Sequence, residues 1–120
     1  MPSRDVAGDL THFIDSLGAT LVFAIEAFET RVAMVTLTED PPALLLAGHL
    51  EGDQPVLVYR VPDLEPQIEE LKLRHVDIAR RFEIPHGPGV ELVVGGPQRI
   101  ALYQLTRPEA PTRLAGRRDF

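Results

Sequence analysis

Cysteine is absent from the 120-residue chain, which excludes several kinds of chemistry at once. Disulfide bridges, thiolate zinc sites, iron–sulfur clusters and a cysteine nucleophile all need this side chain. Long hydrophobic runs are absent too, because the longest, residues 21–25 and 43–47, have only five residues, whereas a membrane span needs about 20. No signal-peptide pattern precedes Asp5. We therefore expect a cytoplasmic protein that is not inserted in a membrane.

Positive charge is scarce as well. The formal net charge is −6 and the pI is near 5.1, which argues against nucleic-acid binding because such proteins usually carry a basic face. The exception is residues 107–120, in which four arginines stand against Glu109 and Asp119. The length suits a single domain, so we expect one domain over residues 1–106, followed by a polar, basic tail.

An internal repeat organises this domain. Asp9-Leu10, Ile14 and Leu17 recur as Asp63-Leu64, Ile68 and Leu71, at a constant offset of 54 residues. In both stretches the apolar spacing predicts a short amphipathic helix with the aspartate as its N-cap. Gly18 ends the first helix, and His75 suits the left-handed residue that ends the second. The repeat predicts two modules, over residues 1–52 and 53–106.

Each helix precedes three β-like runs, and the turns between them are rich in proline and glycine. The runs are 21–28, 31–38 and 43–47 in the first module, and 78–84, 90–94 and 99–105 in the second. Residues 55–61 add a strand before the second helix, which makes that module βαβββ. The matching residues 1–7 have little β character, so the first strand is missing, very short or frayed. The chain terminus, the basic tail or a second subunit could cover the sheet edge left open.

Several segments resemble the vicinal oxygen chelate superfamily, the group of glyoxalases, bleomycin-resistance proteins and extradiol dioxygenases. Residues 58–64 resemble a strand followed by the helix start Asp63-Leu64, and residues 70–76 resemble the end of that helix. Residues 82–89 with 95–103 resemble the closing hairpin and last strand. Residues 13–23, around Leu17-Gly18, resemble the helix and second strand of the first module. The resemblance implies an α+β fold of two tandem βαβββ modules curved around a cavity, and commonly a homodimer.

Enzymes of this superfamily hold one divalent metal with His and Glu or Gln side chains from the first and last strand of each module. Carried over, these positions fall on Val56 and Ala101 in the second module and near Pro2 and Leu44 or Leu45 in the first. None of these side chains can bind a divalent cation. We therefore expect no metal and no cofactor, and the catalytic residues stay unknown.

Strand alternation indicates a binding surface instead. Val56, Val58 and Arg60 share one face, with Leu57, Tyr59 and Val61 packed against the helix, and Arg99, Ala101 and Tyr103 share a face of the last strand. On the third run, either Ala43, Leu45 and Ala47 or Leu44 and Leu46 face inward. Arg60, Arg99 and Tyr103 are candidate polar anchors on apolar surroundings, and His86 lies in a turn beside them. The alternative is that these side chains fill the cavity and the arginines reach water.

The leading hypothesis is a metal-independent protein that binds a partly apolar small molecule in the cavity between the modules. One alternative is a lyase, isomerase or dioxygenase with an atypical metal site that includes His49, His86 or Glu91. Another is a degenerate member that acts as a dimerisation module. The absence of ligands at the inherited metal positions favours the first hypothesis and a non-enzymatic role.

Overall fold

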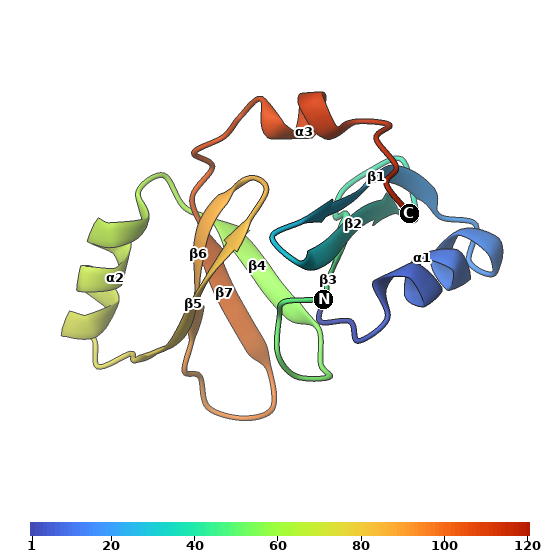
Figure 1. The fold of residues 1–120 in the computed structure, drawn as a ribbon. Helices are drawn as coiled ribbons and strands as arrows, with labels where there is room; N and C mark the ends of the chain where they lie inside the picture. The colour runs from blue at the N-terminus through green and yellow to red at the C-terminus, as the bar shows by residue number, and fades with distance from the viewer. The chain divides into compact units, whose positions relative to one another are not determined.

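The structure is a computed structural model that describes residues 1–120, and the chain forms two compact units. The first consists of Met1–Gln54 with Thr112–Phe120, and the second of Pro55–Pro111. Each unit has one β-sheet with a helix packed on it (Figure 1), which confirms the α+β class expected from the sequence. No helix is both long enough and apolar enough to cross a lipid bilayer.

The first unit is a three-stranded antiparallel sheet with one long helix. Helix α1 (Val6–Asp15) is followed by β1 (Thr20–Ala27), β2 (Thr30–Thr36) and β3 (Leu44–Ala47), in the spatial order β1-β2-β3. Phe28 and Glu29 form the two-residue turn between β1 and β2, and both have positive φ angles. The three strands follow the three predicted β runs closely.

Helix α1 begins four residues earlier than the sequence indicated. Its N-cap is Asp5, whose side chain accepts a hydrogen bond from the Gly8 amide at 3.0 Å. The expected cap, Asp9, lies in the first turn and accepts a hydrogen bond from the Ser3 hydroxyl instead. The prediction was wrong because both aspartates precede an apolar residue, and the sequence does not show which one reaches a free amide at the helix end.

The first strand of this unit is reduced to a single bridge, as the weak β character of residues 1–7 predicted. Pro2 pairs in parallel with Ala47. The Ser3 amide donates to the Ala47 carbonyl at 3.1 Å, and the Ala47 amide donates to the Met1 carbonyl at 2.9 Å. The N-terminus of the chain therefore pairs with β3 at the edge where the strand is missing.

One face of this sheet packs on α1. Leu10 of the helix and Ala33, Val35 and Leu46 of the sheet are buried together, with Leu44 packed against them. Of the two alternatives for the third run, the even-numbered residues therefore face the helix. Leu45 and Ala47, which alternate with them, belong to the opposite face.

The end of the chain contributes structure to the first unit. After the short helix α3 (Ala110–Leu114), Arg118 pairs in parallel with Ala24 on the free edge of β1. The Ala24 amide donates to the Arg117 carbonyl at 2.8 Å, and the Asp119 amide donates to the Ala24 carbonyl at 2.7 Å. Phe120 packs against the core under α1. The expected tail is thus partly an added edge of this sheet, opposite to β3.

The second unit contains a complete βαβββ module. Its elements are β4 (Val56–Arg60), α2 (Leu64–Leu73), β5 (Ile78–Ile84), β6 (Gly87–Leu92) and β7 (Arg99–Tyr103). The sheet order is β4-β7-β6-β5, with β4 and β7 parallel and the other pairs antiparallel. Strand β6 begins three residues before the expected start, so the turn consists of Pro85 and His86 alone.

Helix α2 keeps most of its predicted features. Asp63 is the N-cap residue, but its side chain accepts no capping hydrogen bond. The Leu64 amide donates to the side-chain oxygen of Gln104 at 2.9 Å. His75 has a φ of 63°, which confirms the left-handed position that ends the helix. Leu64 and Ile68 are buried against Val90, and Val61 packs beside them. Two residues expected to pack here, Leu57 and Tyr59, are instead 54% and 56% exposed, because the core under α2 is formed with residues of β5, β6 and β7 and none of β4.

Candidate functional site

The face of the second sheet opposite α2 carries the residues singled out as candidate binding residues. Paired positions on neighbouring strands project from the same face. The register joins Val56 to Arg99, Val58 to Ala101 and Arg60 to Tyr103. The structure therefore brings all six together on one surface, which we call the open face. Their role in binding stays a prediction.

One row of this face crosses all four strands. Phe82 on β5 pairs with Gly89 on β6, Gly89 pairs with Tyr103 on β7, and Tyr103 pairs with Arg60 on β4. A Cβ atom at Gly89 would overlap the Phe82 ring, so this ring lies across the glycine. The row thus has an aromatic side chain over β6, a tyrosine in the middle and an arginine at the edge.

Two polar groups of this row have no partner within the protein. The Arg60 side chain is exposed and makes no ion pair, and the Tyr103 hydroxyl makes no hydrogen bond. His86 lies beside the row, with its ring 6.2 Å from the Tyr103 ring in an edge-to-face arrangement. Its Nδ1 atom is buried and also has no hydrogen-bond partner. The Arg60 and Tyr103 side chains therefore offer unused hydrogen-bonding groups at one end of the open face, and the His86 ring lies beside them.

His86 is held in its neutral form near pH 7. Burial lowers the pKa of its imidazole below the ordinary value, and the positive charge of Arg107 lowers this pKa further. A neutral imidazole has one nitrogen that donates and one that accepts a hydrogen bond. The neutral His86 ring therefore adds no positive charge beside Tyr103.

The next row of the open face holds a buried ion pair. Glu91 pairs with Ala101 across β6 and β7, and its side chain is 8% exposed. Its two carboxylate oxygens accept hydrogen bonds from Arg99 Nε at 2.6 Å and Arg99 Nη2 at 2.9 Å. Arg80 Nε lies 3.2 Å from the same carboxylate. The hydrogen bonds from Arg99 and the charges of both arginines hold the pKa of Glu91 below its ordinary value, although burial alone would raise it.

This pair changes the interpretation of one candidate. Arg99 was expected to be a polar anchor for a ligand, and the structure shows that its guanidinium binds Glu91 through two hydrogen bonds. The sequence left the facing of Glu91 open, and it did not single out Arg80, Phe82 or Gly89. Strand alternation is the sequence signal that could have shown their common face. Arg80 and Phe82 lie two residues apart on β5, and Gly89 and Glu91 lie two residues apart on β6, so the members of each pair point to the same side.

The donor set of the chain does not fit the metal site that the fold family implies. The positions that the resemblance assigns to its ligands hold Val56, Ala101, Pro2 and Leu44 or Leu45, whose side chains have no donor atom. Across residues 1–120, no group of three or more His, Asp or Glu side chains is arranged to hold a metal ion. His49, His86 and Glu91, which the alternative hypothesis combined, form no such group.

Structure comparisons identify the fold. Methylmalonyl-CoA epimerase from Mycobacterium tuberculosis superposes with a TM-score of 0.70 at 18% identity, over 91% of this chain and 86% of that one. A hypothetical protein from Bacillus halodurans gives 0.66 at 13% identity, over 86% and 88%. Glyoxalase I from Zea mays gives 0.56 at 18% identity, over 87% of this chain and 41% of that longer one. No protein-family model and no curated protein sequence matches the chain.

These likenesses show that the chain has the α+β fold of these structures. The glyoxalase-like fold that the sequence resemblance implied is therefore confirmed.

Proposed function

We propose that the chain is a metal-independent small-molecule-binding protein of the glyoxalase and bleomycin-resistance type. Its ligand is partly apolar and anionic, and it binds on the open face of the second sheet. The observation that carries this proposal is that the Arg60 guanidinium and the Tyr103 hydroxyl, at paired positions of one face, have no partner in the protein, with the His86 ring beside Tyr103. Binding sites commonly combine an apolar wall with a few oriented polar groups.

Each part of the ligand has a counterpart on this face. The Arg60 guanidinium suits a carboxylate or phosphate group, because its fork of donors matches the acceptor geometry of these anions. The Tyr103 hydroxyl can donate a second hydrogen bond, and the Phe82 ring offers a flat apolar surface. Val58 and Ala101 extend the apolar surface along the next row. The site holds and orients the ligand, and no covalent step is part of the proposal.

A homodimer belongs to the same proposal. Strand β4 has a hydrogen-bonded neighbour on one side only, and its residues Leu57, Val58 and Tyr59 are exposed. Monomeric proteins usually protect such an edge with charges, proline or a covering segment.

The cytoplasmic location expected from the sequence likewise stays a prediction.

A thermal-shift screen tests the proposed binding. A ligand that binds only the folded state raises the melting temperature, so we expect some members of a panel of aromatic carboxylates, small acids and aromatic antibiotics to stabilise the protein. The variant Arg60→Gln is expected to weaken binding about tenfold, the value of one charge-assisted hydrogen bond. A panel that produces no shift would contradict the proposal.

Arg74→Gln is the matched control. Arg74 lies on α2, is 71% exposed and pairs only with Glu70, at 3.1 Å. This variant removes the same charge from the same unit, so it should leave ligand binding unchanged. Equal weakening by both variants would show that the effect is general electrostatic attraction and not a contact with Arg60.

A further inference from the structure

The two units differ where the chain leaves the last strand of each sheet. In the second unit the Gln104 amide donates to the Pro88 carbonyl at 3.0 Å, and in the first the Gly48 amide donates to the Arg31 carbonyl at 3.0 Å. Pro88 and Arg31 stand at the same place, two residues after the turn of their hairpin. Gly48 therefore corresponds to Gln104, and Glu51, three residues further on, corresponds to Arg107.

In the second unit, Arg107 occupies this end of the hairpin. Its guanidinium donates to the Glu83 carboxylate at 2.8 Å, to the Ile84 carbonyl at 2.6 Å and to the Pro85 carbonyl at 2.8 Å. The backbone amides of Thr106 and Arg107 also bond to the His86 carbonyl. The second unit thus shows that a guanidinium fits against the end of such a hairpin.

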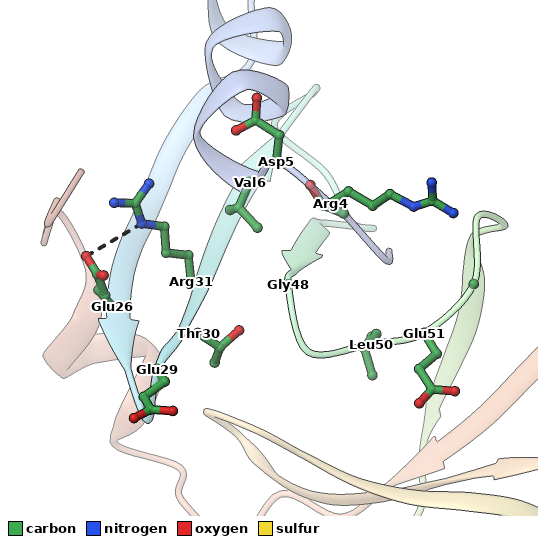
Figure 2. Close-up of a pocket in the computed structure, with 12 residues that line it drawn as sticks. Arg4, Asp5, Val6, Glu26, Glu29, Thr30, Arg31, Gly48, Leu50 and Glu51 are labelled. Carbon is green, nitrogen blue, oxygen red and sulfur yellow. Dashed lines mark ion pairs between the residues drawn. The ribbon is translucent and has the colours of Figure 1, made fainter.

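The first unit has a pocket at the corresponding place. Its volume is about 530 Å³, and its walls come from the β1–β2 hairpin, the segment before α1 and the segment after β3. Figure 2 shows Thr30 and Glu29 on one side, Leu50 and Glu51 on the other, and Val6 beside them. Gly48 lies in the wall, where a Cβ atom would come within 3.1 Å of Thr30 Oγ1 and 3.5 Å of Val6 Cγ2. A side chain at position 48 would crowd these atoms, whereas the Gln104 side chain of the second unit accepts a hydrogen bond from the Leu64 amide.

The charges that line this pocket are mostly negative. The charged residues that line it are four with carboxylates and two with guanidiniums: Asp5, Glu26, Glu29, Glu51, Arg4 and Arg31. Arg31 lies 3.5 Å from Glu26 and stacks on the Phe120 ring at 4.9 Å, so its guanidinium is part of the wall. Glu29 makes no hydrogen bond and no ion pair. Glu26 precedes its turn by the same number of residues as Glu83 precedes the turn of the second unit.

We infer that this pocket is a second binding site, for a ligand that carries an alkylguanidinium or alkylammonium group. The positive group lies near Glu26 and Glu29, where the second unit places its own Arg107. The aliphatic part lies along Val6 and Leu50, and the Thr30 hydroxyl is within the same pocket. All residues that line this pocket belong to the first unit, whereas the open face belongs to the second, and the two sites take ligands of opposite charge.

The test is an NMR titration of the ¹⁵N-labelled full chain with n-butylguanidinium, with the neutral n-butylurea as the matched probe. We expect saturable shifts of the amides of Thr30, Gly48 and Leu50 with the cation only. Glu29→Gln should weaken binding about three- to tenfold, the range for one partly exposed charge contact. Glu39→Gln removes an equal charge from an exposed residue outside the pocket and should leave binding unchanged.

Gly48→Ala tests the location independently, because its methyl group reduces the space beside Thr30 and should weaken binding. Spectra of each free variant establish that it is folded before the titration. Equal shifts with n-butylurea, no saturable shift with the cation, or equal affinities of Glu29→Gln and Glu39→Gln would each overturn the inference.

Discussion

Glu91→Gln is expected to lower the free energy of unfolding by about 2–3 kcal/mol, the cost of leaving a buried charge without its partner. The carboxylate is 8% exposed, and it binds Arg99, which is 14% exposed, through two hydrogen bonds. Glutamine has almost the same shape but no charge, so the guanidinium loses its counterion while the packing is kept. Denaturant unfolding near pH 7 measures the difference.

The effect of this substitution should depend on pH. Because the pKa of Glu91 is below its ordinary value near 4.5 in the folded chain, the pair stabilises the fold fully above that value. Its contribution is lost as the pH falls through the folded-state pKa. The stability difference between wild type and Glu91→Gln should therefore be constant in the neutral range and shrink in acid below about pH 4.5.

Glu70→Gln is the control for this prediction. Glu70 pairs with Arg74 on the surface of α2, and both side chains are more than half exposed, so this change should cost less than about 0.5 kcal/mol. An equal cost of the two substitutions, or a Glu91→Gln effect that stays the same in acid, would contradict the role given to the Glu91–Arg99 pair.

Leu64→Ala is expected to lower the free energy of unfolding by about 2–5 kcal/mol, the range for a leucine removed from a packed core. Leu64 is 2% exposed and packs with Ile68 and Val90 between α2 and the sheet. A domain of this size is stable by only about 5–15 kcal/mol, so the second unit should unfold at a clearly lower temperature or denaturant concentration.

Leu73→Ala provides the same chemical change on the same helix. Leu73 is 82% exposed, so its removal should alter stability by no more than about 0.5 kcal/mol. The comparison cancels the effect of leucine and alanine on helix propensity. Similar costs at positions 64 and 73 would show that α2 does not pack on the sheet as described.

The order of helices and strands could be predicted because apolar spacing and turn residues are local signals. The 54-residue repeat predicted both modules, and the weak β character of residues 1–7 predicted that the first strand is missing or short. The N-cap of α1 was missed because capping depends on which amide a carboxylate reaches. In the structure Gly8 leaves room for this cap, since a Cβ there would overlap the Asp5 carboxylate. The pairing of Arg118 with β1 uses backbone groups, which leave no pattern in the sequence.

The candidate site was predictable only in part. Alternation placed Arg60 and Tyr103 on one face, and the parallel register then joined them. The partner of Arg99 was not foreseen because β6 was expected to begin at Val90, and this left the facing of Glu91 open. The pocket of the first unit was not predicted. Gly48 lies in its wall, and only the backbone hydrogen bonds show that Gly48 corresponds to Gln104 of the second unit.

Metal-independent binding on the open face can be checked by an NMR titration of EDTA-treated, ¹⁵N-labelled protein with the acids that raise its melting temperature. We predict saturable shifts of the amides of Arg60, Tyr103 and His86, with an affinity that does not change when Zn²⁺ or Mg²⁺ is added. Binding that appears only after metal is restored, or shifts that leave these amides unmoved, would contradict the claim.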